Sequence, residues 1–180
     1  FFLKLLNEHY GNVYNEKELE ELAMKVGSDV PFFIKNKTAR VGGKGNKIEL
    51  VENNLKDSLI LVKPLGFGVS TKDAYNSFDE LDEVRYANFE KIVECLRNDN
   101  RKDLEKYIEN GLEQGISERN ADIKMFKAIL NSVVPGKKFF MSGSGSTYYT
   151  FVTEIERSQI ETRLRTFVDN VKIIISKTIN

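Results

Sequence analysis

Three clusters of glycine are the first feature of this sequence that could serve chemistry. They contain seven of the twelve glycines: Gly42, Gly43 and Gly45, then Gly66 and Gly68, then Gly143 and Gly145. Glycine tolerates positive φ and close backbone approach, so such clusters mark either tight turns or loops that hold phosphate. Serines alternate with glycines over residues 142–146, where amides and hydroxyls could converge on an anion. A flexible hairpin is the alternative there, and a hairpin turn is the simplest interpretation of residues 42–45.

An aspartate and a tyrosine are the next candidates. Asp29 follows a predicted helix and precedes the apolar residues 30–33. An acid among apolar residues costs desolvation unless it is paired, hydrogen-bonded or functional, although aspartate is also a common residue of exposed turns. Tyr75 shares a predicted helix with Phe78 and Leu81. It is therefore either part of the core or a platform for a flat ligand.

Histidine and cysteine are nearly absent. His9 is the only histidine, so no pair of histidines can hold a metal, no metal ligand is assigned, and we expect a structural or surface role. Cys95 is the only cysteine and is predicted to be a small, partly buried hydrophobe on a helix. With no disulfide possible within the chain, a reducing compartment is the default, which predicts a cytoplasmic location.

The composition restricts the class of protein. The 180 residues correspond to one domain, or one domain and part of another, since domains hold roughly 100–150 residues. A content of 41% hydrophobic and 30% charged residues excludes collagen-like and wholly disordered chains. The 27 basic and 27 acidic residues balance, which argues against nucleic acid as a partner. The charge balance does not exclude a small nucleotide ligand, no run approaches the ~20 apolar residues of a membrane span, and the oligomeric state stays open.

The first third of the chain is predicted to hold helices and a hairpin. Residues 1–10 have the pattern of the end of a helix. Asn15 and Glu18 form a capping box that opens a second helix, and Gly27 is predicted to end it in the left-handed conformation. A strand is expected over residues 30–34, followed by strands 38–41 and 47–51 that are joined by the glycine turn.

A polar stretch, residues 52–57, is the best candidate for a boundary. After it we expect a strand at 59–62, four helices beginning at Thr71 and near residues 89, 104 and 123, and strands at 138–141 and 147–152. Thr153 and Glu156 form a capping box for a helix with Ile160, Leu164 and Phe167 facing inward. A strand at 171–175 closes the order. This order predicts an α+β fold, a split βαβ or ferredoxin-like arrangement with extra helices in the first crossover.

Four segments together point to one family. They are Gly27-Ser28-Asp29-Val30-Pro31-Phe32-Phe33, Val41-Gly42-Gly43-Lys44-Gly45, the stretch from Lys63-Pro64 through Gly68-Val69-Ser70-Thr71 to Tyr75, and Met141-Ser142-Gly143-Ser144-Gly145-Ser146-Thr147. They resemble, in order, the G-A/S-D-V-P-F motif, the next glycine turn, the P-x(n)-G-V-S-T-x-x-x-Y segment and the third GHMP motif of the 4-diphosphocytidyl-2-C-methyl-D-erythritol kinases, which are GHMP-type small-molecule kinases. Four matches in the right order are more specific than any one of them.

The resemblance implies a domain organisation and a reaction. Residues 1–56 would be the C-terminal part of the family's N-terminal domain, and residues 57–180 its C-terminal domain, with the active site between them. The reaction would transfer the γ-phosphoryl group of ATP to the 2-hydroxyl of 4-diphosphocytidyl-2-C-methyl-D-erythritol, in the non-mevalonate route to isoprenoid (terpenoid) precursors. Mg²⁺ would assist, with ligands that cannot be identified in this sequence.

The resemblance also implies roles for particular residues. Asp29 matches the aspartate that orients or deprotonates the hydroxyl, a task that suits a positioned carboxylate. Tyr75 matches an aromatic residue that stacks on the cytosine ring, and Thr71 would lie close to the same end of the ligand. Three residues of the third motif would lie near the nucleotide: Gly143, Ser144 and Gly145.

The sequence departs from the family pattern in several places. It contains neither the family's phosphate-holding loop, P-x-x-x-G-L-G-G-G-S-S, nor the lysine that partners the aspartate, and it begins at Phe1 rather than at methionine. We therefore expect a C-terminal fragment or processed chain that is inactive alone. Asn46 stands where an acid is common, and the bulky pair Tyr148-Tyr149 leaves open how the chain packs behind the third motif.

Two alternatives remain. Another GHMP small-molecule kinase, acting on a mevalonate derivative, homoserine or a sugar, would share the third motif, although the D-V-P-F and S-T-x-x-x-Y segments together disfavour it. Competition by CMP or CDP would discriminate between these kinases. A non-catalytic ferredoxin-like binding module is the other alternative, and its glycine clusters would be plain turns.

Overall fold

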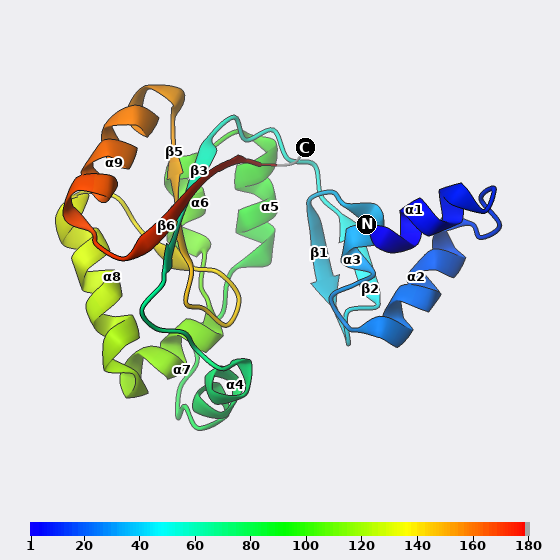
Figure 1. Cartoon of the computed structure of the whole chain (residues 1–180), viewed down its shortest axis with the longest axis horizontal. Helices are drawn as coiled ribbons and strands as arrows, with labels where there is room; N and C mark the ends of the chain where they lie inside the picture. The colour runs from blue at the N-terminus through cyan, green and yellow to red at the C-terminus, as the bar shows by residue number, and fades with distance from the viewer. Residues whose placement is uncertain (179–180) are drawn as a thin grey trace. The chain divides into compact units, whose positions relative to one another are not determined.

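The computed structural model describes residues 1–178, which form two compact units, Phe1–Asn54 and Leu55–Thr178 (Figure 1). The first unit contains three helices, α1 (Phe2–His9), α2 (Glu16–Val26) and α3 (Phe32–Lys35), and one antiparallel hairpin, β1 (Ala39–Gly42) with β2 (Lys47–Leu50). Its small core consists of Leu19, Ala23 and Ile34, with Leu3 and Val30 packed against them. The predicted helix over residues 1–10 and both hairpin strands are confirmed.

The segment between α2 and the hairpin differs from the prediction. The capping box of Asn15 and Glu18 is confirmed, but Gly27 has φ 172° and ψ 157°, which is extended backbone rather than the left-handed stop. The predicted strand at 30–34 is wrong, because residues 30 and 31 form a turn and residues 32–34 lie in α3. Pro31 has φ −59° at the start of that helix, a value that proline fixes and that suits a first turn. The apolar run thereby buries Ile34 in the core of this unit.

The second unit is built on a four-stranded sheet. The strand order is β4 (Phe140–Met141), β5 (Tyr148–Val152), β3 (Ser58–Pro64) and β6 (Val171–Lys177), and every neighbouring pair is antiparallel. Five helices lie between β3 and β4 in sequence, and α9 (Glu154–Phe167) lies between β5 and β6. This is the ferredoxin-like arrangement with an expanded first crossover, so the predicted α+β fold class is confirmed. Strand β4 is shorter than the predicted strand at 138–141.

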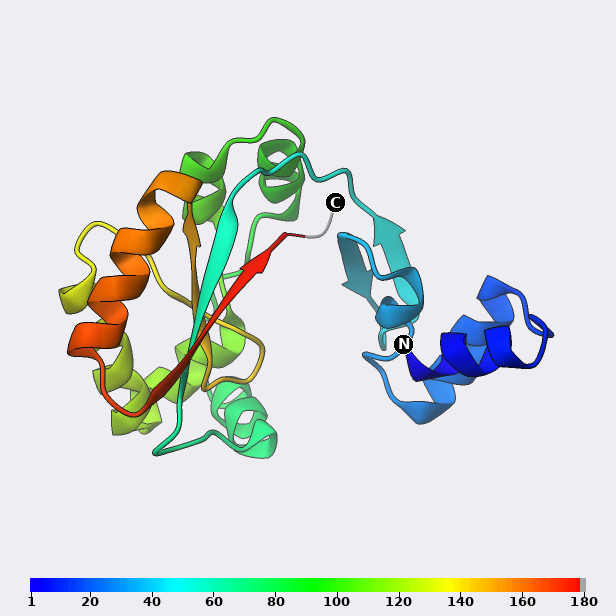
Figure 2. The same ribbon diagram turned by 45° about the horizontal axis from the view of Figure 1, so that its top comes forward.

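Helices cover both faces of this sheet (Figures 1 and 2). On one face, Ile60, Val62 and Val152 pack with residues of α8 (Ala121–Val133) and of α9 in the larger core. On the other face, Phe140 and Phe151 pack with residues of α5 (Phe89–Arg97) and α6 (Arg101–Tyr107). Because successive side chains of a strand point to opposite faces of the sheet, the same strands contribute to two cores.

Four side chains on these helices test the sequence-based predictions of burial. Cys95 on α5 is buried in the smaller core, as predicted. Ile160 and Leu164 on α9 are buried as predicted, but Phe167 is 65% exposed, so its predicted inward position is wrong. Phe167 is the last residue of α9, where the chain leaves the helix for β6.

The sequence analysis missed one helix, α7 (Gly111–Arg119), which packs against α4 (Thr71–Asp79). Glycine is a poor helix former in general, and α7 contains Gly111 and Gly115, so its pattern is weak. The structure explains Gly115, because a Cβ there would lie 2.6 Å from the backbone of Ser77 and Phe78. The two helices approach closely only because this side chain is absent.

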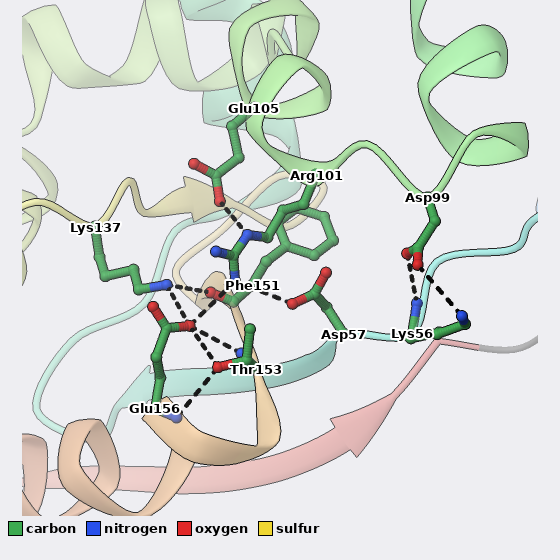
Figure 3. A network of polar contacts seen from close by, with 9 residues as sticks. All are labelled: Lys56, Asp57, Asp99, Arg101, Glu105, Lys137, Phe151, Thr153 and Glu156. Carbon is green, nitrogen blue, oxygen red and sulfur yellow. Dashed lines mark hydrogen bonds and ion pairs between the residues drawn. The ribbon is translucent and has the colours of Figure 1, made fainter.

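A network of charged side chains fixes the start of α9 (Figure 3). Glu156 accepts hydrogen bonds from Arg101 Nη1 at 3.1 Å, Lys137 Nζ at 2.8 Å and the Thr153 amide at 2.9 Å. Arg101 also donates to Asp57 at 3.0 Å. Burial tends to raise the pKa of Glu156, but the bonds from Lys137, Thr153 and Arg101 outweigh it and lower this pKa to about 2. The network therefore connects α6 to the residue before β3 through Asp57, and connects both Arg101 and Lys137 to the start of α9 through the ionised carboxylate of Glu156.

The depressed pKa of Glu156 predicts a specific loss of stability in acid. A carboxyl group whose pKa is lower in the folded state stabilises the fold above its ordinary pKa of 4.5, and this contribution is lost as the pH falls from there to about 2. The Glu156→Gln variant should have a free energy of unfolding at pH 7 that is lower by roughly 1 kcal/mol, a modest value because the contacts of Glu156 are partly open to solvent. On acidification this variant should lose less stability than the unmodified chain. Urea unfolding at pH 7 and pH 3 measures both effects.

Glu161→Gln is the matched control. Glu161 lies on the same helix and pairs with Arg165 across one turn, an exposed arrangement that contributes little. The stability of the Glu161→Gln variant should change with pH in the same way as that of the unmodified chain. A Glu156→Gln variant with the same pH dependence as the control would contradict the assigned role of the network.

Candidate functional site

The glycine–serine loop, residues 142–146, connects β4 to β5. Its backbone is closed by two hydrogen bonds, from the Ser142 amide to the Thr147 carbonyl at 2.8 Å and from the Gly145 amide to the Ser142 carbonyl at 3.0 Å. Gly143 has φ 56° and Gly145 has φ 90°, values that other residues adopt only with strain. The loop is therefore a turn between antiparallel strands. Within it Ser142 is exposed, whereas Ser146 is buried.

The start of α4 lies against this loop. The hydroxyls of Thr71 and Ser144 are 3.1 Å apart, a hydrogen bond that spans 73 positions in the sequence. Ser70 caps the helix by accepting the amide of Asp73. Helix N-termini carry a partial positive charge and unpaired amides, so this junction combines several donors that suit an anionic group.

Tyr75 lies one turn further along α4. Its side chain is 55% exposed, so it is not a core residue, which was the alternative interpretation. The structure thus brings Thr71 into contact with Ser144, which lies between Gly143 and Gly145 in the loop, and Tyr75 follows Thr71 on the same helix. The arrangement offers an open aromatic face beside a group of polar donors.

The residue behind the loop is Tyr148, the first residue of β5. It is fully buried, and its ring contacts Phe126 edge-on with centroids 5.9 Å apart. Burial and the neighbouring charge of Glu113 raise its pKa above the ordinary value of a tyrosine. The bulky side chain of Tyr148, whose packing the sequence left open, therefore fills the larger core of the second unit.

Asn110, just before α7, is a residue that the sequence analysis missed. Its side-chain amide donates to the carbonyls of Met141 at 2.8 Å and Gly143 at 2.9 Å. An asparagine three residues before Glu113 is a recognisable helix start, and that signal could have revealed α7. Nothing in the local sequence indicates its contact with a loop more than thirty positions away.

Asp29 belongs to the first unit. It is exposed in the turn that precedes α3, and the hairpin turn supports the neighbouring backbone. Gly45 has φ 89°, and a Cβ at this position would overlap the carbonyl oxygen of Ser28. The glycine turn is therefore both a hairpin and a close support for the segment that carries Asp29. His9 lies exposed on α1, its ring edge-on to Tyr10, in agreement with a surface role.

The described residues offer little for a metal ion. Within residues 1–178, no three His, Cys, Asp or Glu side chains are grouped so that they could hold one. A cavity of about 530 Å³ lies elsewhere in the second unit, lined in part by Asn110, Glu113 and Lys127 and not by Tyr75 or the glycine–serine loop.

None of the helices within the described residues has the length and apolar character that crossing a membrane requires.

Comparison with known proteins identifies the family. No family model matches the chain. A 4-diphosphocytidyl-2-C-methyl-D-erythritol kinase of Fusobacterium nucleatum subsp. nucleatum is 78% identical over all 180 residues, which span 61% of that protein's length. The chain belongs to the 4-diphosphocytidyl-2-C-methyl-D-erythritol kinase family. A member from Clostridium botulinum (strain Loch Maree / Type A3) is 32% identical over 164 residues, covering 88% of this chain and 56% of that kinase.

Solved structures agree on the fold. A crystal structure of 4-(cytidine 5'-diphospho)-2C-methyl-D-erythritol kinase matches 96% of this chain and 61% of its own with a TM-score of 0.71 at 21% identity. Homoserine kinase from Cytophaga hutchinsonii matches 97% of this chain and 61% of its own with a TM-score of 0.74 at 15% identity. At these identities the likeness of the chain to both structures shows its fold alone.

The contact between Gly45 and Ser28 predicts an unusual cost for one methyl group. Gly45→Ala should destabilise the first unit by roughly 2 kcal/mol more than Gly11→Ala, because only the former meets a backbone carbonyl. Gly11 is a matched control, since it has φ 83° and no atom within 4 Å of its Cβ position. Amide hydrogen exchange in α2 reports the stability of this unit. Equal effects of the two substitutions would show that the close approach is not required.

Proposed function

We propose that this chain supplies part of the active site of a kinase that transfers the γ-phosphoryl group of ATP to the 2-hydroxyl of 4-diphosphocytidyl-2-C-methyl-D-erythritol. The observation that supports the proposal most directly is the 78% identity with the Fusobacterium nucleatum kinase along the whole chain. Because the chain spans 61% of that relative, the complete activity requires the rest of such a protein. In this assignment, residues 1–56 belong to the N-terminal domain and residues 57–180 to the C-terminal domain.

Asp29 is proposed as the residue that handles the proton of the acceptor hydroxyl. In the transfer, the hydroxyl oxygen forms a bond to the γ-phosphorus, the bond between the γ-phosphorus and the bridging oxygen breaks, and ADP leaves. The carboxylate of Asp29 orients the hydroxyl and accepts its proton. Its exposed position allows contact with a substrate, and the backbone beside it is held by the Gly45 contact. General-base assistance of this kind contributes about 10²–10⁴-fold.

Tyr75 and its neighbours are proposed to bind the cytidyl end of the acceptor and the nucleotide. The exposed face of Tyr75 suits stacking on cytosine. The hydroxyl of Thr71 lies within one helical turn of that ring, on the same helix. Gly143, Ser144 and Gly145 would approach the phosphates, where hydroxyl and amide donors stabilise negative charge.

Other requirements of the reaction follow from its chemistry. ATP is the proposed donor, and Mg²⁺ is the ion that commonly accompanies it in phosphoryl transfer, but we assign no Mg²⁺ ligand to this chain. A cytoplasmic location is proposed because the single Cys95 is buried and leaves no disulfide to form within the chain. A net charge of zero favours small molecules over nucleic acid as partners.

The test of the proposed function joins this chain to the part of the Fusobacterium nucleatum kinase that it does not cover. The chimera should phosphorylate 4-diphosphocytidyl-2-C-methyl-D-erythritol in the presence of ATP. Asp29→Asn should lower kcat by about 10²–10⁴-fold with little change in KM. Asp122→Asn, which alters an exposed aspartate in the first turn of α8, serves as the control and should leave kcat unchanged.

Each outcome of this test bears on one part of the proposal. A folded chimera without phosphorylation of the cytidyl substrate would contradict the proposed reaction. An active chimera whose kcat is unchanged by Asp29→Asn would remove the aspartate from the mechanism.

The stacking role of Tyr75 makes a separate prediction about binding. Tyr75→Ala should weaken binding of the cytidyl substrate to the chimera by about 1–3 kcal/mol, the value of one base stacked on an aromatic ring. Tyr86→Ala removes a tyrosine that is 79% exposed and should not change the affinity. Inhibition by CMP checks the same contact, because a kinase acting on homoserine or mevalonate would not recognise it. Equal affinity of both variants would contradict the stacking role of Tyr75.

A further inference from the structure

The glycine–serine loop is held from behind by one side chain. The amide nitrogen of Asn110 donates to the Met141 carbonyl at 2.8 Å and to the Gly143 carbonyl at 2.9 Å. The oxygen of the same side chain accepts the amide of Glu113 at 3.2 Å and thereby caps α7. Asn110 therefore connects the start of a helix to the last residue of β4 and to the loop itself.

Glu113 adds a second connection from the first turn of α7. Its carboxylate accepts the amide of Met141 at 3.3 Å and pairs with Lys127 of α8 at 2.6 Å. Glu113 is only 8% exposed, and loss of its cationic partner would leave a buried carboxylate uncompensated. Met141 is thus fixed through both its amide and its carbonyl, and Gly143 through its carbonyl.

The loop needs such external support because its own backbone is permissive. Gly143 has positive φ, and nothing lies within 4 Å of its Cβ position, so packing does not restrict it. Glycine also has the largest backbone entropy to lose on ordering. Apart from Asn110, the contact from Ser144 to Thr71 is the side-chain hydrogen bond that ties residues 142–146 to a helix of the described chain.

We propose that Asn110 is a positioning residue for the glycine–serine loop. It fixes the carbonyl of Gly143, and through Ser144 and Thr71 it aligns the loop with the start of α4. The effect on phosphoryl transfer rests on the proposed function, whereas the effect on the loop does not. Asn110 contacts no reacting group in this proposal, because it acts only through the loop backbone.

The experiment uses Asn110→Asp, which separates the two roles of the side chain. Aspartate keeps the oxygen that caps α7, and it is as good a cap as asparagine. It replaces the amide donor by an oxygen that repels the carbonyls of Met141 and Gly143. Asn120→Asp is the matched control, because Asn120 caps α8 through the amide of Ile123 at 3.1 Å and has no bond to the loop within residues 1–178.

The first measurement is amide hydrogen exchange in the 180-residue chain. The amides of Ser142 and Gly145 should exchange roughly tenfold or more faster in Asn110→Asp, the effect of losing two hydrogen bonds of ordinary strength. The core amides of Ile123 and Leu130 should be unaffected, and Asn120→Asp should not change the exchange of the loop. Unchanged loop exchange, or an equal increase in loop and core, would overturn the proposal.

The second measurement is kinetic and uses the chimera described above. Asn110→Asp should lower kcat by roughly tenfold while the KM for the cytidyl substrate holds, because Tyr75 is untouched. Unaltered kcat in a variant with a mobile loop would overturn the positioning role in the reaction. If the unmodified chimera has no activity, the proposed function fails, and the exchange result still decides whether Asn110 fixes the loop.

Discussion

The pairing of β3 with both β5 and β6 is the constraint on which the second unit depends. Strand β3 is central to the sheet, and its register sets Val62 opposite Tyr148 on one side and Ile173 on the other. The end of β3 therefore lies beside the start of β5, although 86 positions separate these two residues in the sequence. Because α4 follows β3 and the glycine–serine loop precedes β5, the same register brings Thr71 and Ser144 within hydrogen-bonding distance. The candidate site of this unit is thus a consequence of strand order.

The two adjacent anchors of the loop differ in kind. Asn110 makes neutral hydrogen bonds at the surface of α7, which are worth about 1 kcal/mol each. Glu113 is a buried ion paired with Lys127, and removing either partner would leave an uncompensated charge. The ion pair therefore sets whether α7 and α8 pack correctly around β4, whereas the amide of Asn110 sets where the carbonyl of Gly143 lies. This division allows the loop to be altered without unfolding the helices that carry it.

Local signals in the sequence predicted most of the helices and strands, but few of the contacts between elements that are distant in the sequence. The capping boxes at Asn15 and Thr153 located two helices, because a cap acts within three residues of itself. The segment 30–34 forms a turn and the start of α3 rather than a strand, because Pro31 and the burial of Ile34 outweighed the β propensity of its apolar residues. Helix α7 was missed because its glycines are required by contact with α4, which only the folded chain shows. The bonds of Asn110 to the loop were out of reach for the same reason.

The glycines show most clearly why a motif needs a structure to be understood. From the sequence alone, the glycine clusters could be tight turns or loops that hold phosphate. At residues 42–45 the structure gives a third reason for glycine, which is close approach to another backbone. Gly45 supports the carbonyl beside Asp29, and Gly115 lets α7 meet the helix that carries Tyr75. Each unit thereby preorganises its own candidate residues through contacts within itself.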